Sequence, residues 1–201
     1  MRLGILLSCF LATLLLAGCL GSPEGVNAIN DFEKQRYLGR WYEVARLDHS
    51  FERGLSNVTA DYSLREDGGL KVINRGYSAE EDAWSEAEGK AYFIGDKQQG
   101  QLKVSFFGPF YGSYIIFETG SFPENSSSEK ASYKTLSADY QYSFVAGNST
   151  DYLWLLARTP TISPLLREHF IQRVDKLGFD SQALIFVDQD LNAPPVAKEL
   201  P

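Results

Sequence analysis

Two histidines and two cysteines among 201 residues limit the chemistry open to this chain. His49 and His169 are the first candidates for acid–base catalysis or metal binding, because imidazole titrates near neutral pH and ligates zinc. Neither has a cysteine or a second histidine at a metal-ligand spacing, so the sequence predicts no metal site. The run Asp48-His49-Ser50 holds the residue types of a hydrolase triad, but side chains adjacent in sequence rarely converge on one point.

The sequence motifs of cofactor enzymes and hydrolases are missing as well. There is no Gly-x-Ser-x-Gly, no phosphate-binding glycine loop and no dinucleotide fingerprint. We therefore expect neither a cofactor nor enzyme activity. The net charge of −7, with no run of lysine or arginine, also excludes nucleic acid as a partner.

Cys19 has the most specific surroundings of the reactive residues. A short basic start precedes the apolar run 3–17, which is shorter than the roughly twenty residues of a membrane-spanning helix. The run ends in Leu16-Ala17-Gly18-Cys19, which resembles the bacterial lipobox. The resemblance implies a lipoprotein signal peptide over 1–18 and acylation of Cys19. The alternative is an ordinary secretory signal with a chance cysteine near its end.

Two expectations follow from the lipobox. Cys9 would leave with the signal peptide, so the mature chain could form no intramolecular disulfide. Leu20 follows Cys19 where an aspartate would oppose export. By resemblance to the common lipoprotein sorting rule, this implies a lipid anchor in the outer membrane, facing the periplasm.

The rest of the chain reads as one domain of successive strands after a tether at 19–30. Aromatic residues make up 13% of the chain and suit half-buried β surfaces. Apolar and polar residues alternate over 58–64, and Asp67-Gly68-Gly69 is a strong hairpin signal. The predicted strands are 39–47, 58–64, 70–77, 86–94, 102–107, 113–118, 140–145 and 152–158. Eight strands joined by short hairpins predict an antiparallel up-and-down barrel of the size that holds one small ligand.

A helix and a short last strand follow the barrel. Ser163 is a suitable N-cap, Pro164 suits the first turn, and Gly178 suits the end of the helix. An apolar stripe predicts packing on the outside of the barrel wall, through Leu166, Phe170, Val174 and Leu177. The run 183–187 predicts a ninth strand. We expect a polar loop over 119–137, functional or disordered, and a flexible tail over 191–201.

Gly39-Arg40-Trp41 and Arg158 carry a family resemblance. In this element order they are similar to the Gly-x-Trp and arginine signature of lipocalins, which places an all-β lipocalin domain at 31–190. Segments such as 40–46, 104–112 and 152–160 more closely resemble bacterial outer-membrane lipocalins, relatives of apolipoprotein D. The resemblance implies binding of fatty acids, phospholipids or lysophospholipids for membrane maintenance, and sometimes a homodimer. It fails at 119–137, which looks like an insertion.

The resemblance also implies that Arg158 stacks on Trp41 at the closed end of the barrel, as a structural pair. Strand alternation then predicts which neighbours face inward, provided that no bulge intervenes. From Arg158 and Trp41 these are Tyr152, Trp154 and Leu156, and Glu43, Ala45 and Leu47. Glu43 is predicted either to contact a ligand or to be a structural partner of Arg158.

The candidate ligand-binding residues of the barrel interior combine apolar bodies with a few polar groups. They are Tyr62, Asn74, Phe106, Tyr114, Tyr142, Tyr152, Trp154 and Leu156. Arg46, Arg53 and Arg75 are either head-group contacts near the mouth or solvated side chains. The segment 108–112 is either a mouth-rim or dimer contact or a packed turn. The functional alternative to lipid carriage is a structural or interaction lipoprotein with a filled barrel and no transported ligand.

Overall fold

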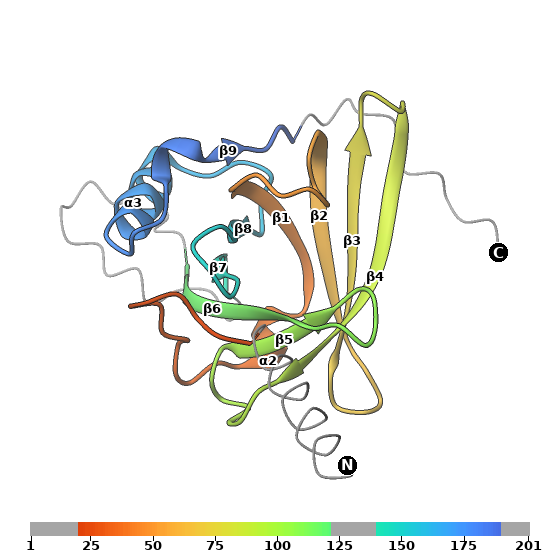
Figure 1. Cartoon of the computed structure of the whole chain (residues 1–201), viewed down its shortest axis with the longest axis vertical. Helices are drawn as coiled ribbons and strands as arrows, with labels where there is room; N and C mark the ends of the chain where they lie inside the picture. Colours follow the sequence, from red (N-terminus) through yellow and green to blue (C-terminus); the bar gives the residue numbers. More distant parts are fainter. Residues whose placement is uncertain (1–19, 122–139, 190–201) are drawn as a thin grey trace, which may run out of the picture.

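The computed structural model describes residues 20–121 and 140–189, and its main element is one antiparallel sheet that closes on itself (Figure 1). The strands are β1 (Gly39–Arg46), β2 (Leu55–Leu64), β3 (Leu70–Ser78), β4 (Ala83–Phe93), β5 (Gln101–Ser105), β6 (Gly112–Gly120), β7 (Tyr142–Ala146), β8 (Leu153–Ala157) and β9 (Ile185–Phe186). Each of the first seven strands pairs with the next, β8 pairs back with β1 to close the barrel, and β9 pairs with β1. The predicted eight-stranded up-and-down barrel with an additional ninth strand is confirmed.

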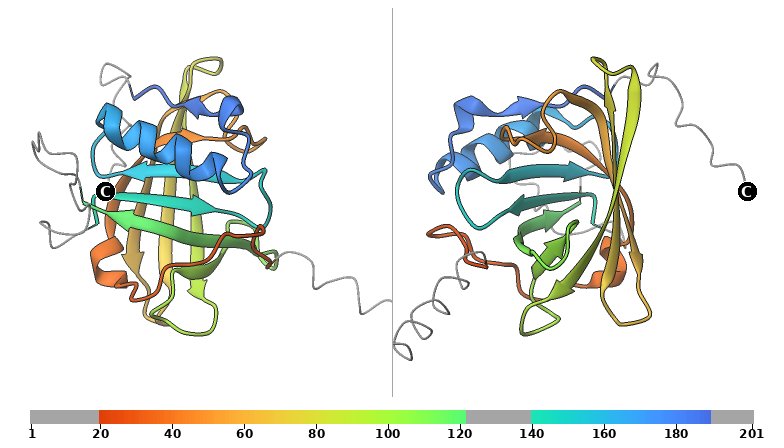
Figure 2. Two further views of the ribbon diagram at one scale, coloured as in Figure 1. Left: turned by 90° about the vertical axis from the view of Figure 1, so that its left-hand side faces the viewer. Right: turned by 45° about the vertical axis from the view of Figure 1, so that its right-hand side comes forward.

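Three short or medium helices accompany the sheet in the described ranges: α2 (Lys34–Tyr37), α3 (Pro164–Asp175) and the 3-10 helix η2 (Ser181–Ala183). The α3 helix begins as predicted, because the Ser163 side chain accepts a hydrogen bond from the Leu166 amide and proline occupies the first turn. Its buried residues pack on the outside of the barrel, across β7 and β8 (Figure 2, left). No helix in the described ranges is long and apolar enough to cross a membrane.

The barrel wall separates two hydrophobic clusters. The outer cluster lies between the wall and α3 and includes Phe144, Leu155 and Phe170. The inner cluster lies inside the barrel and includes Trp41 and Tyr62, together with residues from the other strands. Strands β7 and β8 contribute to both clusters, because α3 covers their outer face. Only the inner cluster can contribute to a site inside the barrel.

The segment 185–189 closes a gap in the wall between β1 and β2. These two strands pair only along the first half of β1, over 39–42. Beyond that, β1 pairs with β9 at 45–46. The Gln189 side-chain amide then donates hydrogen bonds to the carbonyls of Glu43 and Val58, at 2.8 and 3.0 Å. The last described residues therefore belong to the barrel wall.

Several sequence-predicted boundaries differ from the structure or lie outside it. The predicted insertion 119–137 begins too early, since Thr119 and Gly120 still pair with β7. Helix α2 was not predicted, because four residues give no helical period. The predicted signal peptide 1–18, Cys19, the remainder of the insertion and the tail 191–201 lie outside the described residues.

Candidate functional site

Trp41 and Arg158 close one end of the barrel. Trp41 is fully buried, and the Arg158 guanidinium carbon lies 3.8 Å from the centre of its ring. The same guanidinium donates hydrogen bonds to the carbonyls of Arg40, Arg36 and Tyr140, at 2.7, 3.0 and 3.1 Å. A cation held this way joins three chain segments to the first strand. The geometry agrees with the structural role expected for this pair.

Gly39 and Tyr37 explain how Trp41 reaches this position. Gly39 has a φ of +88°, a left-handed conformation that side-chain-bearing residues rarely adopt. The turn it makes between α2 and β1 brings the Trp41 indole N–H to the Tyr37 carbonyl, at 2.8 Å. The signature residue Gly39 is therefore required by backbone geometry and contributes no ligand contact.

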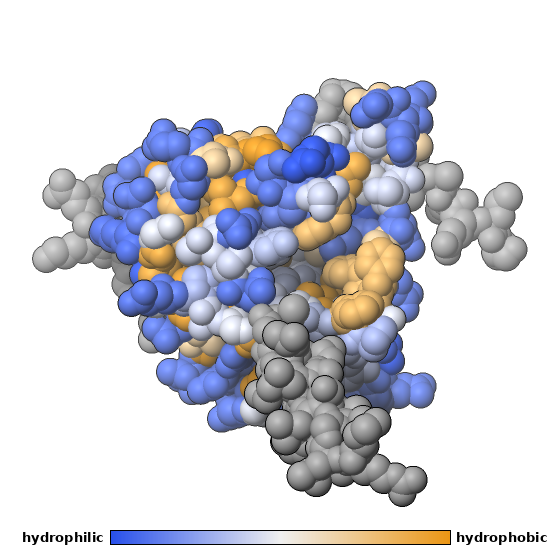
Figure 3. All heavy atoms as spheres, in the orientation of Figure 1, coloured by the Kyte–Doolittle hydropathy of each residue, from blue (hydrophilic) through white to orange (hydrophobic). Residues whose placement is uncertain are grey.

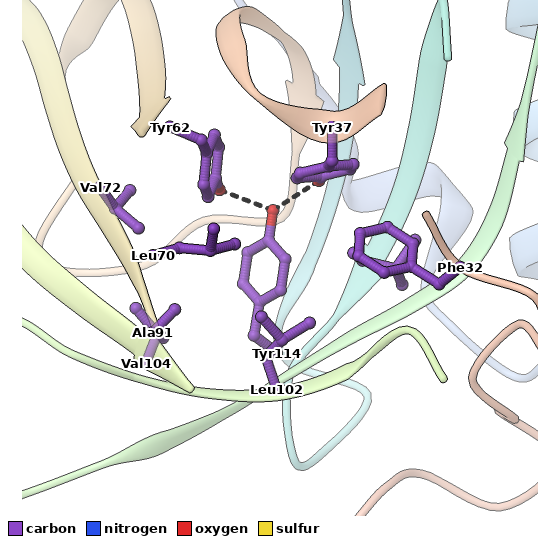
Figure 4. Close-up of a pocket in the computed structure, with 10 residues that line it drawn as sticks. Phe32, Tyr37, Tyr62, Leu70, Val72, Ala91, Leu102, Val104 and Tyr114 are labelled. Carbon is purple, nitrogen blue, oxygen red and sulfur yellow. Dashed lines mark hydrogen bonds between the residues drawn. The ribbon is translucent and has the colours of Figure 1, made fainter. Parts of the chain in front are cut away.

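Three tyrosine hydroxyls meet above this floor (Figure 4). The Tyr114 hydroxyl lies 2.8 Å from that of Tyr37 and 2.7 Å from that of Tyr62, and Tyr37 donates to the Ser143 hydroxyl at 3.2 Å. Since each phenol has one proton, Tyr114 must then donate to Tyr37, and Tyr62 to Tyr114. All three tyrosine donors are used within this tyrosine layer, defined as Tyr37, Tyr62 and Tyr114.

The cavity at the tyrosine layer is small and apolar. It measures about 10 Å³, which is room for about one water molecule. Burial raises the pKa of Tyr37 to about 12 and raises the pKa of Tyr62 and Tyr114 well above the ordinary value, so all three phenols stay neutral. The cavity is lined by Phe32, Tyr37, Tyr62, Leu70, Val72, Ala91, Leu102, Val104, Tyr114 and Ile116. The lower half of the barrel is therefore filled by side chains.

Above the tyrosine layer, small side chains occupy the inner face of β2, β3 and β4. Ala60, Asn74 and Ala87 lie side by side on this part of the wall, because Asn74 pairs with both alanines. One step further toward the mouth, Gly76 pairs with Ser85. Ala87 and Ser85 are exposed although alternation places them on the inner face. The upper half of the barrel is thus wider than the lower half and open to solvent.

Asn74 is a polar group in this otherwise apolar wall. Its side-chain oxygen is buried and has no hydrogen-bond partner among the described residues. A buried acceptor without a donor costs about 1–3 kcal/mol relative to a satisfied one. Asn74 can therefore gain a hydrogen bond from a hydroxyl or N–H group placed inside the barrel.

A polar cluster lies on the opposite side, below the β1–β2 loop, and consists of Glu43, Arg46, His49, Glu52 and Trp154. Arg46 forms a buried ion pair with Glu43 at 2.7 Å and donates to the Glu52 carbonyl at 2.8 Å. The Trp154 indole donates to the Glu52 carboxylate at 3.0 Å, and a His49 nitrogen lies 3.3 Å from it. Burial and the Glu52 charge raise the pKa of Glu43, while Arg46 opposes the shift. The Arg46 guanidinium is thus paired with the Glu43 carboxylate, while the Glu52 carboxylate is held by Trp154 and His49.

The structure brings most of the candidate interior residues together. Five of them belong to or pack against the inner cluster, namely Tyr62, Phe106, Tyr114, Trp154 and Leu156. Asn74 shares their face by alternation. Tyr152 lies just before β8, is more than one-third exposed and stacks on His49 with ring centres 5.5 Å apart. It lies at the mouth of the barrel.

The prediction for Tyr142 was wrong. Its ring packs on Phe144 in the outer cluster, with ring centres 5.1 Å apart, and its hydroxyl donates to Glu118 at 3.4 Å. Every residue of β7 is buried because α3 covers its outer face. Alternation of burial therefore gave no sign of which side faces inward.

A bulge overturned the alternation predicted along β1. The register with β8 shifts between Glu43 and Ala45. Ala45 and Leu47 consequently lie in the outer cluster, while Arg46 turns inward and is buried. The ion-pair partner of Glu43 is Arg46 and not Arg158, which corrects the second prediction for Glu43.

Like Arg46, the other two arginines considered for a head group are already paired with carboxylates. Arg53 contacts Asp48 at 2.6 Å in an exposed ion pair. Arg75 contacts Asp61 and Glu86, at 2.9 and 2.7 Å. Arg46 is thus the one of the three that lies inside the barrel.

Sequence reasoning missed several residues that shape the interior. Phe32 and Tyr37 precede the first strand, yet they line the deep cavity. His49 and Glu52 come from the β1–β2 loop, which folds back over the polar cluster. The sequence did hold one sign of Phe32 and Tyr37, since both are aromatic residues shortly before the turn at Gly39. Residues 20–121 and 140–189 contain no group of three or more histidine, cysteine or acidic residues placed to hold a metal ion.

Comparison with known proteins identifies the family. A family profile described as "Lipocalin-like domain" matches residues 32–189. The chain is 55% identical over 179 residues to "Outer membrane lipoprotein Blc" of Vibrio cholerae, covering 89% of this chain and 95% of the relative. It is 44% identical over 191 residues to the Escherichia coli K12 protein of the same name, covering 94% and 98%.

More distant proteins share the fold. Mouse apolipoprotein D is 28% identical over 198 residues, covering 90% of this chain and 93% of the relative. The structure of insecticyanin from the tobacco hornworm Manduca sexta superposes with a TM-score of 0.61 at 18% identity, covering 88% and 91% of the two chains. The chain therefore belongs to the lipocalin family, as one of its outer membrane lipoproteins, and is a binding protein rather than an enzyme.

Proposed function

We propose that this lipocalin binds fatty acids, phospholipids or lysophospholipids in the upper half of its barrel and stores or carries them for membrane maintenance. The observation that carries the proposal is the change in side-chain size along the inner wall. Tyr62 and Val72 fill the lower half, whereas Ala60, Asn74 and Gly76 leave the upper half open. An apolar, solvent-open calyx with a few polar groups suits an amphipathic ligand.

The polar groups support one orientation of the ligand. The tyrosine layer is neutral and its phenol donors are all engaged, so it offers little to a carboxylate or phosphate. An acyl chain pointing toward it buries apolar area, at roughly 25 cal/mol per Å². The head group then lies at the level of Asn74, the polar cluster and the mouth. Arg46 is the positive charge at that level.

The lipid anchor is part of the proposal. Cys19 follows a lipobox-like sequence, and the relatives of highest identity given above are named outer membrane lipoproteins. We assign acylated Cys19 as the anchor of this chain in the outer membrane, facing the periplasm. Several acyl chains on one cysteine would hold the protein stably, where one chain would be marginal.

Native mass spectrometry of a form lacking residues 1–19, followed by lipid extraction, tests the binding role. We expect a bound lipid that denaturation releases and that added lysophospholipid or fatty acid displaces. The same spectra report whether the protein is a homodimer. A protein that carries no lipid, and that also refuses fluorescent fatty acids and lysophospholipids, would refute lipid carriage.

One observation favours a second function. The cavity at the tyrosine layer measures about 10 Å³, far too little for an acyl chain. If the upper half were equally filled in solution, the protein would be a structural or interaction lipoprotein without a transported ligand. Titration with a fluorescent lipid separates lipid carriage from the structural role, because binding saturates only if the calyx is open.

A further inference from the structure

Three phenylalanines lie exposed on loops at the open end of the barrel. Phe107 and Phe110 in the β5–β6 hairpin are 80% and 75% exposed, and Phe51 in the β1–β2 loop is 59% exposed. Because the strands run up and down, both loops lie at the end opposite α2. We call Phe51, Phe107 and Phe110 the aromatic rim. Large exposed aromatic side chains on loops at one end of a domain are candidates for an interaction surface.

Positive charge lies beside the aromatic rim in this otherwise acidic chain. The ammonium groups of Lys90 and Lys103 lie 5.9 and 4.8 Å from the ring centre of Tyr111, in the same β5–β6 hairpin. In the space-filling view, hydrophobic side chains reach the surface next to this hairpin, among hydrophilic ones (Figure 3). Aromatic rings with neighbouring lysines match the interface of an anionic phospholipid bilayer, where rings enter the head-group layer and lysines meet phosphates.

The start of the described chain lies at the same end of the barrel. The Ser113 hydroxyl, at the base of the β5–β6 hairpin, donates a hydrogen bond to the Gly21 carbonyl at 2.7 Å. The red N-terminal segment accordingly runs beside β6 and starts on the side away from α2 (Figure 2, left). Cys19 is two residues before Gly21, which is a reach of about 7 Å in an extended chain.

We propose that the aromatic rim docks on the phospholipid surface of the membrane that holds the anchor, so that the mouth of the barrel faces the bilayer. Residues 21–30 run along the barrel, so the link that remains is the step from Cys19 to Gly21. An anchor at Cys19 would therefore hold Ser113 and the hairpin close to the head-group layer of the membrane. A lipid could then pass between bilayer and barrel without crossing water. This inference rests on the proposed anchor and does not depend on which ligand the barrel binds.

The test uses the full lipidated protein in vesicles of phosphatidylethanolamine and phosphatidylglycerol. Cys9 and Cys19 are the two cysteines of the sequence, and neither leaves a free thiol after processing. A single introduced cysteine can therefore carry an environment-sensitive fluorophore. The reporting variant is Phe110→Cys, and the matched control is Glu66→Cys in the β2–β3 turn, which is exposed at the closed end.

We expect nitroxide-labelled lipids to quench the fluorophore at position 110 about twofold or more, since docked rings lie roughly 5–10 Å into the interface. The fluorophore at position 66 should keep its emission. Equal quenching at both sites, quenching at 66 alone, or none at either would overturn the proposal. Excimer emission from a pyrene label at position 110 would show two labels in contact. The aromatic rim would then bind a second copy of this chain, which would also overturn the proposal.

A second pair of variants separates docking from ligand binding. Phe107→Ser with Phe110→Ser removes two rim side chains, and Leu64→Ser with Leu165→Ser removes two exposed apolar side chains elsewhere. We expect the rim variant, at matched reconstitution, to transfer fluorescent lipid from its own vesicle about tenfold more slowly. Its binding of the same lipid in detergent solution should be unchanged. A transfer rate equal to that of the Leu64/Leu165 control would overturn the proposal. Loss of lipid binding in detergent by both double variants would instead count against the proposed function.

Discussion

The Arg158 guanidinium lies 3.8 Å from the centre of the Trp41 ring and donates hydrogen bonds to the carbonyls of Arg36, Arg40 and Tyr140. The contact spans the chain from its first strand to the end of its eighth. The carbonyls come from three separate segments, so one side chain connects helix α2, β1 and the approach to β7. The closed end of the barrel depends on this connection.

Replacing Arg158 with alanine should lower the free energy of unfolding by about 2–4 kcal/mol, from the lost cation–π contact and charged hydrogen bonds. For a domain of this size, the melting temperature should fall by roughly 5–15 °C. The melting temperature of Arg158→Lys should lie between those of the native protein and Arg158→Ala, because lysine keeps the charge but lacks the planar fork. Arg40→Ala, which removes an exposed ion pair with Asp61, is the control and should change little. Equal melting temperatures for the two alanine variants would contradict the role of Arg158.

The tyrosine layer predicts an asymmetry between two conservative variants. Tyr114→Phe leaves the buried Tyr62 hydroxyl without its acceptor, so it should cost about 1–3 kcal/mol. Tyr62→Phe removes one donor and leaves Tyr114 bonded to Tyr37, at a cost of about 0.5–1.5 kcal/mol. Urea unfolding of both variants checks the order. A larger loss for Tyr62→Phe would show that the hydroxyl chain runs in the other direction.

Glu43 predicts a pH dependence of stability. Burial, with the Glu52 charge, raises the pKa of Glu43, so the folded state holds a proton that the unfolded state releases. The contribution of Glu43 to the free energy of unfolding should therefore rise as the pH falls through the raised pKa. It should level off below the ordinary value of about 4.3.

Glu43→Gln is the matched variant, since it keeps an acceptor for Arg46 and removes the titration. The difference in unfolding free energy, native minus variant, should increase on acidification from neutral pH. A difference that shrinks instead would mean that the Arg46 ion pair outweighs burial and lowers the pKa of Glu43.

The open upper half of the barrel predicts where bulk blocks binding. Ala60→Phe places a ring on the inner wall beside Asn74 and should weaken binding of a fluorescent fatty acid by about tenfold or more. Thr59→Phe places the same ring on the outer face of β2 and should leave the affinity unchanged. Fluorescence titration of both variants, after circular dichroism has confirmed folding, decides the matter. Unchanged affinity of Ala60→Phe would place the ligand elsewhere.

Much of the fold was predictable because its strands follow simple patterns. The Gly39-x-Trp41 and Arg158 signature, the hairpin turns and the Ser163-Pro164 helix start each have a local physical cause that is visible in the sequence. The barrel and its outer helix follow from their order. The interior residues on β2, β3 and β8 could also be predicted, because those strands alternate regularly on the inner face.

Two predictions failed where a neighbouring element overrides the alternation. The bulge after Glu43 exchanges Arg46 for Ala45 on the inner face, and nothing in the run of residues marks it. Strand β7 is buried on both faces because α3 covers one of them, so Tyr142 could not be assigned to either side. His49 and Glu52 were missed because the folded β1–β2 loop brings them to the barrel interior, where Glu52 contacts both Arg46 and His49.

The gap between β1 and β2 that the segment 185–189 closes has a consequence for how the protein is made. The first strand bonds to β8 and β9, more than a hundred residues further along the chain, so the barrel cannot close until synthesis is nearly complete. Contacts of such long sequence separation also form slowly. The order of strands thus leaves β1 without its neighbours on one edge until the last part of the domain is present.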